Sequence, residues 1–249
     1  MRIVGVIPSR GGSTRFYNKP LANIHGKPMV WWVYHHAKEV ECFEEVYIAT
    51  DSEEIKEVCE SFGAKVVMTS KDHDTATDRL YEVSQQIDAD LYVMINGDEP
   101  AIGAKDIVKC IPDNLNSEEF YVSNLMTDFT DPVEVIDTSN LKIVTNKDGI
   151  CLFISRNPIP YPKGGMNYSY QKFVGVGAFT KNALHYYHDT PRGPIEKIEE
   201  NDSFRFIENR KDIYYINAHC KTISVDTPKD IEKVEQYMKQ SSKLQTVTI

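Results

Sequence analysis

The feature that most constrains the fold is an alternation, in the first half of the chain, of short uninterrupted apolar runs with segments of helical period. Runs of this kind are typical of strands that helices cover on both faces. The predicted strands are 3–7, 46–50, 65–68 and 91–95, and the predicted helices are 29–39, 53–62 and 78–86. This order predicts an α/β protein with a doubly wound, mostly parallel sheet, whose ligands bind at the carboxyl ends of the strands.

From about residue 121 the sequence becomes richer in β-strand patterns. We predict strands at 122–126, 141–144, 151–155 and 174–179, with hairpin turns at 146–149 and 158–165. A β-rich insert, roughly 121–179, therefore lies within a single domain that covers 1–249. Beyond it we expect a helix at 193–200, strands at 213–217 and 222–225, a helix at 228–239 and a frayed tail.

Composition limits the class of protein. With 41% hydrophobic and 26% charged residues, the 249-residue chain has enough apolar material for a core and does not resemble a disordered chain. Its formal net charge of -9 argues against general binding to nucleic acid or to an anionic membrane. Without a long apolar stretch or a signal-peptide pattern, we expect a cytoplasmic protein. The 5 Cys are scattered without metal-ligand spacing, and we expect them to be reduced.

A cationic loop containing two glycines follows the first predicted strand. The segment from Pro8 to Arg15 carries Arg10, Gly11, Gly12 and several hydroxyls, and Lys19 comes shortly after it. Backbone N–H groups and cationic side chains at this edge of a sheet can hold a polyphosphate. The segment is neither a Walker A loop nor a dinucleotide-binding glycine motif, and a solvated basic turn is the alternative interpretation.

Two aspartates stand at the ends of other predicted strands. Asp98 lies in the segment 96–100 directly after an apolar strand, and Asp226 follows the predicted strand 222–225. Carboxylates placed in this way can hold Mg²⁺ against phosphate oxygens, although each alone also fits a turn or helix-capping Asp. A cationic loop and two carboxylates at one sheet edge together indicate transfer at a phosphorus centre.

In these segments the chain resembles the CMP-sugar acid synthetases, and most closely the 3-deoxy-manno-octulosonate (Kdo) cytidylyltransferases. The resemblance extends from Ile3 to about Met238, and the matching segments are 10–21, 26–29, 49–51, 73–79, 96–100, 155–160 and 225–228. It implies a nucleotide-diphospho-sugar transferase-like fold and a Mg²⁺-dependent nucleotidyltransferase. The implied reaction transfers CMP from CTP to a Kdo-like 2-keto-3-deoxy sugar acid and releases pyrophosphate, for bacterial lipopolysaccharide or capsule synthesis. A homodimer is also implied.

The resemblance further implies roles for single residues. The expected catalytic residues are Arg10, Lys19 and Asp98, and the expected Mg²⁺ ligands are Asp98 and Asp226. The expected substrate-binding residues are Pro8, Ser13, Arg15, Thr77, Arg79, Asn96, Lys142, Phe173, Glu199 and Asp202. CTP and a small anionic acceptor are the expected partners. No residue stands out as a general base.

The acceptor side departs from the family pattern. The family's sugar-contacting strand begins with His where this chain has Phe173, and the Glu and Gln expected near residue 200 are Asp202 and Ser203. Asn96 replaces a Gln. Exchanging groups that hydrogen-bond a substrate changes which substrate is accepted. Two alternatives therefore stay open: a cytidylyltransferase for another sugar acid or a small phosphorylated or phosphonate compound, and a non-catalytic nucleotide-binding protein.

Overall fold

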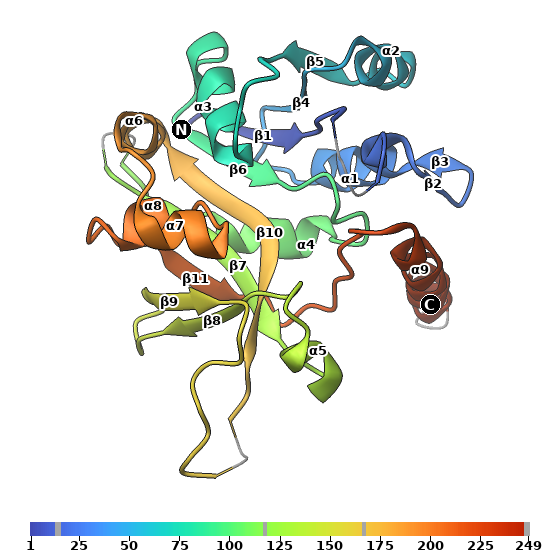
Figure 1. The fold of residues 1–249 in the computed structure, drawn as a ribbon. Helices are drawn as coiled ribbons and strands as arrows, with labels where there is room; N and C mark the ends of the chain where they lie inside the picture. The colour runs from blue at the N-terminus through green and yellow to red at the C-terminus, as the bar shows by residue number, and fades with distance from the viewer. Residues whose placement is uncertain (13–15, 117–118, 166–167, 247–249) are drawn as a thin grey trace.

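The computed structural model describes residues 1–12, 16–116, 119–165 and 168–246, and for 241–246 it describes the backbone alone. At its centre is a nine-stranded sheet in the order β11-β7-β10-β6-β1-β4-β5, with β8 beside β10 and β9 beside β8 (Figure 1). The strands are β1 (Ile3–Pro8), β4 (Glu45–Thr50), β5 (Lys65–Met68), β6 (Leu91–Ile95), β7 (Val122–Asp128), β8 (Lys142–Thr145), β9 (Cys151–Ser155), β10 (Gln171–Thr180) and β11 (Tyr214–Asn217). A separate two-stranded ribbon contains β2 (Asn23–Ile24) and β3 (Lys27–Pro28).

The first half of the chain forms the parallel part of the sheet, as predicted. β1 pairs in parallel with β4 and β6, and β4 pairs in parallel with β5. Each of these strands agrees with its predicted range to within one residue. The apolar runs are uninterrupted because helices cover both faces of this part of the sheet. For example, Val4 and Ile7 on β1 and Val93 on β6 are completely buried.

Helices cover both faces of the sheet (Figure 1). They are α1 (Met29–Lys38), α2 (Glu53–Ser61), α3 (Ala76–Gln86), α4 (Ala104–Ile107), α5 (Pro132–Ile136), α6 (Lys181–Asp189), α7 (Pro194–Glu199), α8 (Phe204–Ile207) and α9 (Pro228–Thr246), with 3-10 turns at Lys19–Leu21 and Val108–Cys110. Side chains of α1, α2 and α4 share one core, and those of α3, α6 and α8 share another. This arrangement confirms the predicted doubly wound α/β fold.

Local sequence sets where the helices beside the strand ends begin. Ser52 caps α2, because its hydroxyl accepts a hydrogen bond from the Ile55 amide. Thr75 caps α3 in a reciprocal capping box, in which the Thr75 hydroxyl accepts from the Asp78 amide and the Asp78 carboxylate accepts from the Thr75 amide. Both helices therefore start at the edge of the sheet where β4 and β1 end.

The strands of the region 121–179 belong to the same sheet. β7 and β10 lie within it, and β10 is antiparallel to its neighbours β6 and β7. β8 and β9 form a hairpin that turns at 146–149, as predicted. The prediction of a hairpin turn at 158–165 is wrong, because the flanking strands β9 and β10 both pair with β8 and not with each other.

Two other expectations near the C-terminus are also wrong. The segment 222–225 forms no strand, because its hydroxyl side chains and the Val225 amide bond to the turn after β6 instead of to a neighbouring strand. The expected frayed tail continues the last helix, since α9 runs to Thr246. None of the described helices is long and apolar enough to cross a membrane.

Candidate functional site

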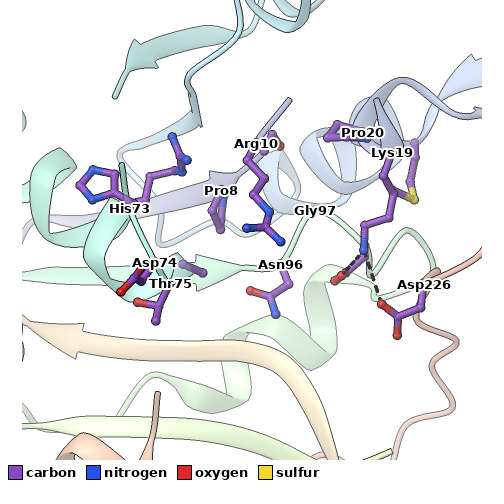
Figure 2. A pocket seen from close by; sticks show the side chains of 15 residues that line it. Pro8, Arg10, Lys19, Pro20, His73, Asp74, Thr75, Asn96, Gly97 and Asp226 are labelled. Atoms are coloured by element: carbon purple, nitrogen blue, oxygen red, sulfur yellow. Dashed lines mark hydrogen bonds and ion pairs between the residues drawn. The ribbon is translucent and has the colours of Figure 1, made fainter. Parts of the chain in front are cut away.

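A polar cavity of about 270 Å³ opens at the carboxyl ends of β1 and β6. Its lining comes from the loop after β1, the turn after β6, the start of α3, and Asp226 just before α9. In Figure 2, Arg10 and Lys19 point into the same space as Asn96 and Asp226. The sheet edge predicted to bind ligands therefore brings together charged side chains from distant parts of the chain.

The loop after β1 lies close against the turn after β6. Gly97 permits this approach, because a Cβ at this position would lie 3.1 Å from the Pro8 carbonyl oxygen and 3.2 Å from the Ser9 hydroxyl. Pro8 and Arg10 both line the cavity, and the Arg10 side chain is exposed to it. The hydroxyl of Ser9 is buried and has no hydrogen-bond partner among the described residues, so it is free to bond a ligand. The predicted phosphate-binding residues Ser13 and Arg15 lie outside the described residues.

Lys19 stands between the two predicted metal-binding carboxylates. Its ammonium nitrogen lies 2.7 Å from Asp98 Oδ2 and 3.7 Å from Asp226 Oδ1 (dashed lines in Figure 2). The Val225 amide donates to the Asp98 carbonyl at 2.9 Å, which fixes Asp226 next to the turn after β6. The structure thus brings together residues that are separated by 79 and by more than 200 positions in the sequence. Among the described residues, no group of three or more His, Cys, Asp and Glu side chains is arranged to hold a metal ion.

Glu99 holds the turn after β6 against β10 and against the segment that precedes Asp226. The sequence alone did not reveal this role. Its carboxylate is buried and accepts hydrogen bonds from the hydroxyls of Thr222 and Ser224 and from the Gly175 amide. Burial raises the pKa of Glu99, and the nearby Asp98 carboxylate adds to this shift. The signal in the sequence was the pair of hydroxyl residues two positions apart, just before Asp226.

Arg79 is held rigidly at the wall of the cavity. Arg79 is 3% exposed, and its guanidinium donates to the Thr69 hydroxyl, to the Ser70 carbonyl at 3.2 Å and to Asp51 at 3.2 Å. Asp51 also accepts from the Gly11 amide at 2.9 Å. Through Asp51, Arg79 therefore ties the end of β4 and the loop after β1 to α3.

A smaller cavity of about 50 Å³ adjoins the first one and shares Ala76 and Asn96 with it. Three predicted acceptor-side residues, Thr77, Phe173 and Asp202, line this cavity. Phe173 reaches it because β10 runs antiparallel to β6, with Val176 opposite Ile95, so that the preceding residues of β10 lie beside the turn after β6. The structure therefore separates the charged cavity from a smaller one, which is lined by residues expected to bind the acceptor.

Lys142 and Glu199 lie outside both cavities. The Lys142 side chain is fully buried, and its ammonium donates to the carbonyls of Asp137, Asn140 and Arg156 at 2.6, 2.8 and 2.7 Å. All three of its N–H bonds are used in this way. Glu199 accepts hydrogen bonds from the Ser155 hydroxyl and the Arg156 amide. In this structure both side chains hold the loops around the β8–β9 hairpin together and contact neither cavity.

Comparison with known proteins identifies the family. Residues 4–244 match the cytidylyltransferase family. The chain is 35% identical over 239 residues to 3-deoxy-manno-octulosonate cytidylyltransferase of Escherichia coli, covering 96% of this chain and 97% of that protein. It is 36% identical over 240 residues to 8-amino-3,8-dideoxy-manno-octulosonate cytidylyltransferase of Shewanella sp. (strain ANA-3), covering 95% and 98%.

A solved structure gives the same result. CMP:2-keto-3-deoxy-manno-octonic acid synthetase complexed with CTP has a TM-score of 0.90 against this fold, with 35% identity and coverage of 97% of this chain and 100% of that one. The predicted nucleotidyltransferase fold is thereby confirmed. The chain belongs to the cytidylyltransferase family.

Proposed function

We propose that this protein transfers CMP from CTP to a 2-keto-3-deoxy sugar acid of the Kdo type and releases pyrophosphate. The observation that carries the proposal is the convergence of Lys19, Asp98 and Asp226 in one cavity beside the exposed Arg10. The relatives named for Kdo and for its 8-amino counterpart support this class of acceptor. The activated sugar would then serve a transferase that builds surface polysaccharide.

In the proposed reaction, a hydroxyl of the acceptor attacks the α-phosphorus of CTP, and the bond to the pyrophosphate oxygen breaks. Arg10 and Lys19 supply positive charge where negative charge develops on the leaving pyrophosphate. Arg79 holds the loop after β1 in place through Asp51, which accepts hydrogen bonds from both the Arg79 guanidinium and the Gly11 amide. Apart from positioning and charge stabilisation, phosphoryl transfer demands little covalent chemistry from the protein.

We further propose that Asp98 and Asp226 bind Mg²⁺. Both side chains offer the oxygen ligands that Mg²⁺ prefers, and both already lie against one cation, the Lys19 ammonium. Mg²⁺ usually takes one or two protein carboxylates and completes its shell with waters and substrate phosphates, so two carboxylates are sufficient. When bound, the ion would supply Lewis-acid charge at the phosphate and lower the pKa of the attacking hydroxyl. Lys19 would then release the carboxylates and bind phosphate.

The test measures pyrophosphate release from CTP and Kdo with and without Mg²⁺. We expect turnover that depends on the metal and falls by about a hundredfold or more in Asp98→Asn and Asp226→Asn, since each removes one charged group from the reaction centre. Asp189→Asn, an exposed position at the end of α6, is the matched control and should behave as wild type. A wild-type protein that binds CTP but releases no pyrophosphate with any sugar acid would instead favour the non-catalytic nucleotide-binding alternative.

We also propose a cytoplasmic homodimer. Edge strand β9 exposes Leu152 (56%) and Phe153 (37%), and Ile198 on α7 is 84% exposed. Exposed apolar side chains on an edge strand favour pairing with a second copy. Light scattering should give twice the monomer mass, and Leu152→Glu should lower it to the monomer value. A cytoplasmic location is supported by the substrate CTP and by five cysteines that are all unpaired.

A further inference from the structure

The last helix is joined to the charged cavity through its first turn. Asp226 lines that cavity and precedes the start of α9 by two residues. The Asp230 carboxylate accepts hydrogen bonds from the Asp226 amide at 3.3 Å and from the Thr227 amide and hydroxyl, both at 2.9 Å. The Asp226 backbone is therefore bound to the first turn of α9, and a tilt of this helix changes the direction of the Asp226 side chain.

A tight turn places His25 against the same helix. His25 and Gly26 link β2 to β3 with φ values of 49° and 80°, as in a two-residue hairpin turn with positive φ at both positions. The Gly26 amide donates to the Asn23 side-chain oxygen at 2.8 Å and closes the turn. A single residue separates β2 from the 3-10 turn that begins at Lys19. The β2–β3 ribbon therefore carries His25 at its tip and follows directly after Lys19.

His25 holds Glu235 of α9 at two points. Its backbone amide donates to Glu235 Oε1 at 2.8 Å, and its ring Nε2 lies 3.0 Å from the Glu235 carbonyl oxygen. Because a carbonyl oxygen only accepts hydrogen bonds, Nε2 carries a proton and is the donor. The ring Nδ1 lies 3.7 Å from the same Oε1 atom. We call these contacts the His25–Glu235 clasp.

The clasp holds α9 at a distance from its first turn. Glu235 comes seven residues after Pro228, which corresponds to about 10 Å along a helix. The helix lies at the periphery of the molecule and packs on a small apolar cluster (Figure 1). The Val225 amide holds the start of the helix at the Asp98 carbonyl, and the clasp holds the helix farther along. Together the two attachments fix the tilt of α9.

We propose that His25 and Glu235 are positioning residues, which keep Asp226 beside Lys19 and Asp98 by docking α9 on the β2–β3 ribbon. The inference rests on the proposed function, in which Asp226 belongs to the reaction centre. Neither His25 nor Glu235 lines the charged cavity, so neither should contact CTP. Their effect on the reaction is exerted through the direction of the Asp226 side chain.

The first experiment measures steady-state kinetics with CTP, Mg²⁺ and the sugar acid that the wild-type enzyme turns over. In Glu235→Ala we expect kcat to fall by about tenfold and the KM for CTP to change by less than about threefold, because a misplaced group at the reaction centre lowers the rate more than the binding. Glu235→Gln keeps a side-chain oxygen that accepts from the His25 amide, so its kcat should stay within about twofold of wild type. Glu232→Ala, at an exposed position of the same helix, is the matched control.

A second variant acts on the other half of the clasp. His25→Asn keeps a residue type that tolerates positive φ, and it keeps the backbone amide that bonds Glu235, but it removes the ring donor. We expect a smaller fall in kcat, of about threefold, because one of the two attachment points remains.

Trp32 gives a readout that does not depend on turnover. Its indole N–H donates to the Ile24 carbonyl at 2.8 Å, its ring lies edge-on to the His25 ring with centroids 6.4 Å apart, and it packs in the same apolar cluster as α9. The chain has 2 Trp, so Trp31→Phe leaves Trp32 as the only indole. In that background, Glu235→Ala should release α9 and shift the fluorescence emission to longer wavelength, whereas Glu235→Gln should not.

The inference is overturned if Glu235→Ala keeps the kcat of wild type, or if Trp32 emission shifts while kcat stays the same. An equal fall in kcat in Glu235→Gln or in Glu232→Ala would also overturn it, because the effect would then not depend on the clasp. If the wild-type protein turns over no sugar acid, the proposed function itself fails, and that result is seen before any substitution is made.

Discussion

Glu99 offers the sharpest test of how the two metal-binding candidates are held together. Its buried carboxylate accepts from the Thr222 and Ser224 hydroxyls and from the Gly175 amide. Glu99→Ala removes all three hydrogen bonds and opens a cavity. At about 1 kcal/mol for each hydrogen bond, we expect the free energy of unfolding to fall by about 3 kcal/mol. Glu99→Gln keeps the shape and one acceptor oxygen, so its loss should be about 1 kcal/mol.

The effect on activity should be larger than the effect on substrate binding. Thr222 and Ser224 precede Asp226 by only a few residues, so releasing them lets Asp226 move away from Asp98. A displacement of about 1 Å at a reaction centre can cost about a hundredfold in rate. We therefore expect kcat to fall by about that factor in Glu99→Ala and by only a few-fold in Glu99→Gln, with a smaller change in the KM for CTP.

Urea unfolding and steady-state kinetics test these values side by side. Glu57→Ala on the exposed face of α2 is the control for removing a glutamate. Because burial raises the pKa of Glu99 above its ordinary value of 4.5, its contribution to stability is greatest below that pH and declines as the pH rises through the folded-state pKa. Glu99→Gln should remove this decline. The reasoning is refuted if Glu99→Ala keeps wild-type stability and kcat, or if the Gln variant is as damaged as the Ala variant.

Three further substitutions test neighbouring parts of the structure. Lys142→Met should lower the free energy of unfolding by about 3 kcal/mol in urea titration, because three carbonyls lose their donor. The KM values for CTP and for the acceptor should stay unchanged. A selective rise in the acceptor KM would instead indicate that Lys142 contacts the substrate. Gly175→Ala should raise the acceptor KM, because the new Cβ would lie 2.7–2.8 Å from the Asn96 side chain. Gly103→Ala is the control and should leave the acceptor KM unchanged, because a Cβ at residue 103 would meet no atom within 4 Å. Glu45→Gln should cost about 1 kcal/mol at neutral pH by thermal unfolding, and the difference should vanish as the pH falls from 4.5 toward 2.

The pH dependence at Glu45 follows from competing effects on its pKa. Partial burial alone would raise the pKa, but hydrogen bonds from Lys65, Lys38 and the Val46 amide outweigh it and lower the pKa to about 2. Because the folded-state pKa lies below its ordinary value, the contribution to stability is present above that value and is lost on acidification. Both lysines are substantially exposed, so solvent screens their interaction with Glu45. The expected loss of stability in Glu45→Gln is therefore well below the value that the full pKa shift of Glu45 would imply.

The sequence predicts the parallel strands well because their apolar runs are short, continuous and buried on both faces. The segment 222–225 carries a different strand signal, in which Ile223 and Val225 alternate with hydroxyl residues, and it forms no strand. There the hydroxyls bond to Glu99, and the apolar residues pack in the small core with α9. Alternating apolar and polar residues indicate only that one side of a segment is buried. Whether a neighbouring strand or another part of the protein covers that side depends on tertiary contacts. Short helices such as α5 and α8 leave too few turns for a period to be visible.

The charged cavity was predictable in outline for a simple reason. Lys19 and Asp98 follow the loop after β1 and the end of β6, and the ends of parallel strands meet at one edge. Asp226 joins them although no strand precedes it, because the Val225 amide donates to the Asp98 carbonyl. The role of Lys142 was not predictable in the same way, because a lysine at the start of a strand is normally exposed. Only the folded loops show that three carbonyls surround its ammonium.

The same contacts explain how the acceptor side can depart from the family pattern while the charged cavity keeps it. Two hydrogen bonds from backbone groups of β10 join it to the turn after β6: the Asn96 amide donates to the Gly175 carbonyl at 2.7 Å, and the Gly175 amide donates to the Glu99 side-chain carboxylate. Backbone hydrogen bonds do not depend on the side chain two residues earlier, so Phe173 can replace another residue without moving the turn that carries Asp98. Asp202 reaches the smaller cavity from a different segment, before α8. We therefore expect substitutions of Phe173 or Asp202 to change acceptor choice while the geometry of the charged cavity stays fixed.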